Sequence, residues 1–282
     1  MVIDASVGES PAWLLPTSVG GGRLEIGMKI SVITVTLNSG STVRDTFMSL
    51  CGQTHTDVEL VVVDGASTDT TLDIIKEFKE RLGERMCYVS EPDGGIYDAM
   101  NKGLAMATGD VVGFLNSDDF YTSCHTLELV ATRMAAGDVD AVYGDVHYVK
   151  RDDTSKCVRY YSSRMFRPWM MRLGFIPAHP SFYCRRDVLE RYGSFDTSYR
   201  VAGDFEHLLR LIFIHRITTA YLPADFVTMR KGGVSTSGLR SHWLTTRDHL
   251  RALRSNGVRS GVLLLGLRYL YKLAELAFRK FK

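Results

Sequence analysis

The sequence lacks any paired arrangement of cysteines. Its five cysteines lie far apart and include no Cys-x-x-Cys pair, which argues against a zinc ribbon and against a disulfide-stabilised fold. The eight histidines show no His-Glu-x-x-His or other short metal-ligand spacing, so nothing indicates a histidine-based zinc enzyme. We therefore expect a protein of a reducing compartment.

Long apolar runs and a secretory leader are missing as well. No stretch approaches the roughly 20 apolar residues of a spanning helix, and the uncharged run at 260–267 is far too short. The first residues hold Asp4, Glu9 and Gly20-Gly21-Gly22 but no basic region followed by an apolar one, which a signal peptide requires. We expect residues 1–27 to be a disordered extension or an over-long gene start.

Charge is spread unevenly along an otherwise ordinary globular composition. The chain of 282 residues has a net charge of +2, yet the part from Arg240 onward holds ten Lys and Arg against Asp248 and Glu275, a net of +8. A basic tail on an acidic body points to an anionic partner. The tail has no recognised nucleic-acid-binding motif, so we expect an anionic membrane surface instead.

The tail also has a helical pattern with two interpretations. One face collects apolar side chains and the opposite face collects mostly basic ones, as in a helix that lies in a membrane interface or in one that packs on the body. The apolar positions are Leu263, Leu267, Leu270, Ala274, Phe278 and Phe281. We expect residues 240–282 to form a basic amphipathic helical tail at the inner face of the plasma membrane.

Strands and helices alternate through the first part of the chain. Apolar runs at 30–36, 58–63 and 86–90 read as buried strands, and amphipathic helical patterns follow the first two. This alternation predicts an α/β fold with a mostly parallel sheet and helices on both faces. In such sheets ligands bind beyond the carboxyl ends of the strands, where Asn38, Asp64 and Asp93 fall.

The stretch 91–119 is the most informative part of the sequence. It reads as a glycine-rich loop, a helix from about Ile96, and a buried strand at 111–115 that ends in Ser117-Asp118-Asp119. Adjacent carboxylates repel unless a cation or hydrogen-bond donors hold them, and oxygen ligands suit Mg²⁺ or Mn²⁺. An isolated Asp-Asp pair is more often a turn, so the wider pattern has to decide.

That pattern resembles the family 2 glycosyltransferases with the GT-A fold, from Ile30 to about Ser237. The matching pieces are SVITVTLN, VVVDGASTDTT, DGGIYDAMNKG, GDVVGFLNSDD, HPSFYCRRDVLERYGSFD, AGDFEHLLR and GGVS. The resemblance implies a catalytic domain at 28–239, with a nucleotide-sugar-binding half at 28–120 and an acceptor-binding half at 121–239.

The resemblance also implies roles for the acidic residues. Asp64 reads the nucleobase, the triplet 117–119 carries the ribose and the divalent metal, and Asp204 is the general base. The sequence departs from the family where Val35 replaces a common Pro, Gly65 a common Asp, and Ser117 the first acid of the triplet. The last change shifts metal binding toward Asp119 and leaves Asp118 for the ribose or a metal-bound water.

Further residues complete the expected site. Thr36, Asn38, Asp93, Asn101 and Lys102 are expected to contact the donor, and Arg230 or Lys231 in a glycine-rich loop is expected to close over its diphosphate. Trp169, His179 and Glu206 are weaker candidates on the acceptor side. For Trp169 a place in the core is an equally good interpretation, and for His179 a structural role is favoured.

Taken together, these features predict an inverting glycosyltransferase that moves a sugar from a nucleotide-sugar, with a UDP-sugar as the expected donor, to a hydroxyl of a lipid-linked saccharide or glycolipid. Two alternatives are open. A sugar nucleotidyltransferase would need a glycine-rich signature with a basic residue after its first strand, where only Arg44 is available. A non-catalytic nucleotide-sugar-binding assembly protein would have no need of Asp204.

Overall fold

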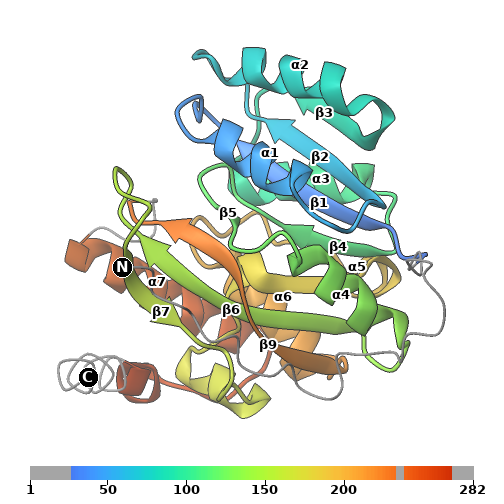
Figure 1. Ribbon diagram of the computed structural model, residues 1–282. Coiled ribbons are helices and arrows are strands. Elements are labelled where there is room, and N and C mark those ends of the chain that lie inside the picture. Colours follow the sequence, from blue (N-terminus) through green and yellow to red (C-terminus); the bar gives the residue numbers. More distant parts are fainter. Residues whose placement is uncertain (1–26, 233–237, 269–282) are drawn as a thin grey trace, which may run out of the picture.

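The structure of the protein is a computed structural model that describes residues 27–232 and 238–268. One curled sheet forms its centre, with helices on both faces (Figure 1). The strands lie in the order β3-β2-β1-β4-β8-β6-β9-β5, and β7 pairs with β6. They are β1 (Ile30–Thr36), β2 (Val58–Asp64), β3 (Met86–Ser90), β4 (Val111–Phe114), β5 (Phe120–Tyr121), β6 (Ala141–Val149), β7 (Cys157–Tyr161), β8 (Phe182–Arg185) and β9 (Thr219–Arg230). The α-helices are α1 (Val43–Cys51), α2 (Thr71–Leu82), α3 (Ile96–Met106), α4 (Thr126–Ala135), α5 (Arg186–Tyr192), α6 (Gly203–Leu208) and α7 (Gly238–Ser255).

The first half of the sheet is parallel, as the alternation of strands and helices predicts. β3, β2, β1 and β4 pair in parallel, and every residue of β1 and β2 is buried because helices cover both faces of such a sheet. In this register Thr36 lies beside Asp64, and Asp64 beside Ser90. The carboxyl ends of these strands therefore meet along one edge of the sheet.

The second half of the sheet is mixed. β8 runs antiparallel to both β4 and β6, whereas β6 and β9 are parallel. β6 and β9 are long continuous strands, and their register is irregular around Asp145. α6 begins at Gly203 and continues as the π-helical turn η4 (Leu209–Ile214).

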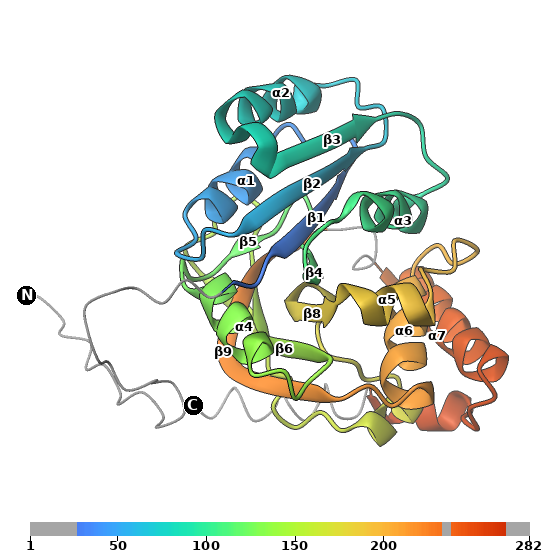
Figure 2. The ribbon, with the colours of Figure 1, turned by 90° about the vertical axis from the view of Figure 1, so that its right-hand side faces the viewer.

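The apolar core lies in two layers, one on each face of the sheet. One layer packs α1, α2 and α4 against the strands, with Phe47, Phe78 and Leu127 fully buried. The other packs α3, α5, α6 and α7, with Phe205 and Leu208 at its centre. Figure 2 shows these helices on either side of the sheet. Helices on both faces are what the sequence predicts.

The described part of the basic tail packs on the body. α7 contacts α6, ends at Gly257 in the left-handed conformation (φ +67°), and a second short helix follows at 262–268. Leu253, Val258 and Leu265 are buried in the same core layer as Phe205. In the described part of the tail, the glycine turn separates α7 from the helix at 262–268, which is the first part of the amphipathic pattern at 257–282.

Some expectations lie outside the described residues. These are the extension at 1–26, the loop at 233–237 and the last part of the tail at 269–282. Within the described ranges no helix is both long and apolar enough to cross a membrane.

Leu265→Ala should destabilise the protein, whereas Leu263→Ala should not. Leu265 is 0% exposed and Leu263 is 89% exposed, and truncating a buried leucine costs about 2–5 kcal/mol through lost burial and the cavity left behind. Urea unfolding of both variants measures the difference. Equal midpoints for the two variants would show that 262–268 is not part of the folded core.

Candidate active site

The edge where β1, β2 and β4 end brings together the predicted donor-binding residues. Thr36 and Asp64 end β1 and β2, and the triplet 117–119 follows β4. The hydroxyls of Ser39 and Ser117 lie 2.8 Å apart, so the loop after β1 touches the triplet. Residues that lie up to 80 positions apart in the sequence therefore line one site.

Asp64 is completely buried and its carboxylate is satisfied by protein donors. The Ser67 amide donates to Oδ2 (3.0 Å), the Ser67 hydroxyl to Oδ1, and the Ser90 hydroxyl to Oδ2 (2.7 Å). The side chain that the resemblance assigns to the nucleobase thus fixes the loop after β2, and its influence on a base would act through that loop.

Asn38 and Thr36 differ in whether their side-chain oxygens have hydrogen-bond partners within the protein. Asn38 adopts a left-handed conformation (φ +50°), which asparagine tolerates, and its Oδ1 accepts the Thr68 amide (2.9 Å). Thr36 is buried, and its Oγ1 has no hydrogen-bond partner in the described part of the chain. Thr34 within the same strand also has an unpaired buried hydroxyl, so the position of Thr36 at the strand end is what keeps it a candidate for the donor.

The glycine-rich loop after β3 closes against the loop after β2. Asp93 accepts the Gly95 amide (2.8 Å), and a Cβ at Gly65 would come within 2.6 Å of Asp93 Oδ2. Lys102 forms an ion pair with Glu91 (2.7 Å). Lys102 therefore holds this loop, and Gly65 lets the two loops approach.

Of the two adjacent aspartates after β4, Asp119 is held by its own loop, by β9 and by α1. Asn116 Nδ2 donates to Asp119 Oδ2 (3.1 Å), the Arg230 amide donates to Oδ1 (3.3 Å), and the Thr46 hydroxyl donates to the main-chain oxygen of Asp119 (2.7 Å). Burial, with the adjacent charge of Asp118, raises the pKa of Asp119 to about 8. Burial also raises the pKa of Asp118.

This pair suits a divalent cation. A buried carboxylate with a raised pKa gains stability when a cation neutralises it, and carboxylate oxygens are the ligands that Mg²⁺ and Mn²⁺ prefer. The described residues contain no group of three or more His, Cys, Asp or Glu side chains arranged for a metal. Asp118 and Asp119 would therefore share a cation with oxygens of the donor and water.

Arg230 is fixed beside the carboxylates. It ends β9, donates from Nη1 to the main-chain oxygen of Asp118 (2.8 Å), and forms an ion pair with Asp45. Its guanidinium lies 4.9 Å from the centre of the Phe120 ring. Of the two candidates for a closing cation, Arg230 is thus part of the strand, whereas the Lys231 side chain is exposed.

Asp204, the predicted base, lies at the start of α6 against α3. Its Oδ1 accepts the Phe205 amide (2.8 Å) and lies 3.5 Å from the Tyr97 hydroxyl, which donates to the Val201 carbonyl (2.7 Å). Burial raises the pKa of Asp204 to about 6. A base with a pKa near the working pH is efficient, because it is mostly ionised yet still accepts a proton.

Tyr97 is a site residue that sequence reasoning missed. Its ring lies so close to the chain that a Cβ at Gly203 would come within 2.7 Å of it. It also lines a cleft of about 520 Å³ between the glycine-rich loop and Thr197–Arg200. The sequence held one indication of this role, because Tyr97 lies inside the stretch DGGIYDAM that matches the family.

Tyr148 is the second missed residue. On one side of β9, Tyr148 of β6 pairs with Met229. On the other side, Phe120 of β5 pairs with Thr228, so Asp119, which precedes Phe120, lies near Met229. The charges of Asp119 and Asp204 both raise the pKa of Tyr148, after the larger effect of burial. Tyr148 therefore lies within electrostatic reach of both Asp119 and the predicted base.

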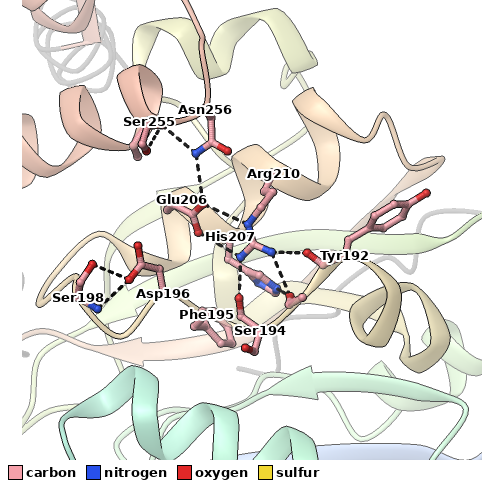
Figure 3. A network of polar contacts seen from close by, with 12 residues as sticks. Tyr192, Ser194, Phe195, Asp196, Ser198, Glu206, His207, Arg210, Ser255 and Asn256 are labelled. Carbon is pink, nitrogen blue, oxygen red and sulfur yellow. Dashed lines mark hydrogen bonds and ion pairs between the residues drawn. The ribbon is translucent and has the colours of Figure 1, made fainter.

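Asn101 and Glu206 hold structural elements together. Asn101 donates to the Phe195 carbonyl (2.9 Å) and accepts the Phe195 amide (2.9 Å). Glu206 accepts from Arg210 (3.1 Å) and Asn256 (3.2 Å), and Figure 3 shows this network joining α6 to the end of α7. The donor contact expected of Asn101 and the acceptor contact expected of Glu206 stay predictions, and the structure shows these side chains in bonds within the protein.

His179 and Trp169 have different surroundings. His179 is buried against Phe114 and Phe195, with ring centres 5.1 and 5.7 Å apart, and burial lowers its pKa to about 4. This is the structural role that the sequence favours. Trp169 is 58% exposed on η2 (Pro168–Leu173), so it is not a core residue.

Asp119→Asn should stabilise the metal-free protein at alkaline pH. Because the folded pKa of about 8 lies above the ordinary value of 3.8, the folded state binds more protons than the unfolded state between these values, and stability falls as pH rises. The gain in melting temperature over the unmodified protein should grow from pH 5 to pH 9 in EDTA.

Added Mn²⁺ should raise the melting temperature of the unmodified protein and not that of Asp119→Asn. Asp138→Asn is the control, since Asp138 is exposed and a hydrogen bond from Arg133 lowers its pKa. The melting temperature of this variant should not rise above that of the unmodified protein at alkaline pH. A uniform loss of stability at all pH values in the Asp119 variant would contradict the assignment.

Comparison with known proteins gives a family and a fold. The family model "Glycosyl transferase family 2" matches residues 31–193. A "PGL/p-HBAD biosynthesis glycosyltransferase" of Mycobacterium bovis is 33% identical over 209 residues, which cover 73% of this chain and 79% of that protein. An uncharacterized glycosyltransferase of Nostoc sp. is 33% identical over 126 residues, 45% of this chain and 39% of the relative.

Solved structures share the fold at lower identity. TarS 1-349 of S. aureus in complex with UDP-GlcNAc has a TM-score of 0.63 and 20% identity, covering 80% of this chain and 66% of that chain. The mannosyltransferase PcManGT of Pyrobaculum calidifontis, in complex with GDP-Man and Mn²⁺, has a TM-score of 0.57 and 19% identity, covering 89% and 81%.

Proposed function

Because the chain belongs to glycosyl transferase family 2, we propose that it transfers a sugar from a UDP-sugar to a hydroxyl of a lipid-linked saccharide or glycolipid, with inversion at the anomeric carbon. One observation carries the proposal. Asp119 and Asp204 are carboxylates whose pKa values are raised by burial, and both lie near enough to Tyr148 for their charges to raise its pKa, after the larger effect of burial. Displacement of a diphosphate requires a charge-neutralising centre and a proton acceptor near each other.

On the donor side, the strand-end loops hold the nucleotide. Thr36 offers an unpaired hydroxyl, the loop fixed by Asp64 and Asn38 borders the base, and Arg230 supplies positive charge beside the carboxylates. A Mg²⁺ or Mn²⁺ ion on Asp118 and Asp119, when bound, would neutralise the charge of the departing diphosphate.

On the acceptor side, Asp204 takes the proton of the attacking hydroxyl. The Phe205 amide keeps the Asp204 carboxylate in place, and the Tyr97 hydroxyl lies 3.5 Å from it. The polar cleft beside Tyr97 would receive the acceptor saccharide. Direct attack by a hydroxyl on the face opposite the diphosphate inverts the anomeric centre.

Two further points support a glycolipid acceptor at a membrane. The relative from M. bovis is named for PGL/p-HBAD biosynthesis. The donor has separate support, since TarS and PcManGT were solved with nucleotide-sugars. The basic C-terminal region, with a net charge of +8 from Arg240, would attract the protein to the anionic inner leaflet from the cytoplasm.

A donor panel tests the proposal. With Mn²⁺ and UDP-, GDP- and dTDP-sugars, we expect slow hydrolysis of one UDP-sugar, measured as released UDP, and loss of that activity in excess EDTA. No hydrolysis of any donor would favour a non-catalytic nucleotide-sugar-binding protein. Hydrolysis that persists in EDTA would remove the metal from the proposal.

Asp204→Asn should keep donor binding and lose transfer by ~10²-fold or more, because only the proton acceptor is removed. Donor binding is measured by calorimetry and transfer with a glycolipid acceptor. Glu206→Gln is the matched control two residues away: it should lower the melting temperature by weakening the Arg210 and Asn256 bonds and leave kcat within a few-fold. The reverse pattern would make Glu206 the base.

A further inference from the structure

Two segments far apart in the sequence expose large apolar side chains next to each other. Met165 and Trp169 are 68% and 58% exposed, and Val262 and Leu263 are 62% and 89% exposed. Arg172 Nε donates to the Arg259 carbonyl (3.0 Å) and the Ser260 hydroxyl donates to the Arg172 carbonyl (2.6 Å), which joins the segments. Figures 1 and 2 both show them side by side at the bottom of the molecule.

The geometry of η2 directs Trp169 toward the second segment. In a 3₁₀-helix residues i and i+3 eclipse, so Trp169 lies on the same side as Arg172, whose side chain reaches Arg259. On the helix at 262–268, Leu265 points into the core while Val262, Leu263, Leu264 and Leu267 stay exposed. The exposed side chains therefore form one surface.

The charge around this surface has one sign. Arg164, Arg167, Arg172, Arg254 and Arg259 are exposed on the two segments, and neither 162–176 nor 254–268 contains an acidic residue. In the described part of the chain, no carboxylate pairs with Arg167, Arg172 or Arg259. Residues 269–282, which follow directly, add four basic residues against Glu275.

We infer that this surface, defined by Met165, Trp169, Val262, Leu263 and Leu267 with Arg167, Arg172 and Arg259, is where the protein docks on an anionic lipid membrane. Exposed apolar patches of this kind mark contacts with a membrane or with another protein. Because arginines and no acidic residues surround this patch, we infer a negatively charged membrane as the partner. Tryptophan and arginine suit the boundary between headgroups and acyl chains. The inference extends the proposed membrane location and moves Trp169 from the acceptor site to the docking surface.

Vesicle binding by the full-length chain tests it. The protein should bind vesicles with about 30 mol% phosphatidylglycerol much more tightly than pure phosphatidylcholine, and less tightly at high salt because the ionic part is screened. The double variant Trp169→Gln/Leu263→Gln should bind both kinds at least ~10-fold more weakly. Arg167→Gln/Arg259→Gln should lose the preference for anionic vesicles.

A matched control lies at the opposite end of the molecule. Met48 on α1 is 47% exposed and Arg81 on α2 contacts its sulfur (3.4 Å), so Met48→Gln/Arg81→Gln removes one apolar and one basic group elsewhere. This variant should bind vesicles as the unmodified protein does. Donor hydrolysis without vesicles should be equal in all four proteins and shows that each is folded.

Other results would overturn the inference. Unchanged vesicle binding by both surface variants would do so, as would a lipid-free dimer that Leu263→Gln dissociates, since a second copy would then cover the surface. If no protein hydrolyses a donor while the vesicle results hold and thermal melts show folding, the surface stands and the proposed enzymatic function fails.

Discussion

Two adjacent carboxylates at the end of a buried strand are the constraint on which the site depends. β4 carries Asp118 and Asp119 out of the core at a point where burial raises the pKa of both. Long hydrogen bonds from Asn116 and from the Arg230 amide stabilise the Asp119 carboxylate. The Thr46 hydroxyl holds the main-chain oxygen of Asp119, and a cation–π contact with Phe120 fixes Arg230. These contacts come from α1 and β9, so the carboxylates are in place only when both halves of the sheet have formed.

The second half of the site depends on contacts between α3 and the segment that precedes α6. Tyr97 touches Asp204, and Asn101 clamps the backbone of Phe195 through both ends of its amide. α3 begins in the glycine-rich loop that borders the donor side. One helix thereby connects the proposed donor loop to the proposed base, and Tyr97 and Asn101 make its contacts to the segment before α6.

The C-terminal region serves the body and, in our inference, the membrane. Leu265 and Arg268 face inward, where Arg268 donates to His249 (2.7 Å), while Leu263 and Val262 face outward. A short helix with both faces apolar suits a segment that lies between a core and a second apolar phase. The sequence pattern predicts an amphipathic helix whose apolar face includes Leu263 and Leu267, and both of these side chains are exposed. The buried side chains of this helix, Leu265 and Arg268, lie outside the predicted apolar face.

The sequence by itself determined the parallel first half of the sheet, the strand-end positions of Asp64 and Asp118-Asp119, and the family, because these depend on local apolar periodicity and on short motifs. The sequence did not determine which polar side chains are already bonded to other parts of the protein. Asn101, Lys102 and Glu206 carry the residue types of ligand contacts, yet each is used by a partner 4 to 94 residues away. Tyr97 and Tyr148 became site residues only through tertiary packing, since no local pattern says that a tyrosine on a helix or strand will lie beside a carboxylate from a distant segment.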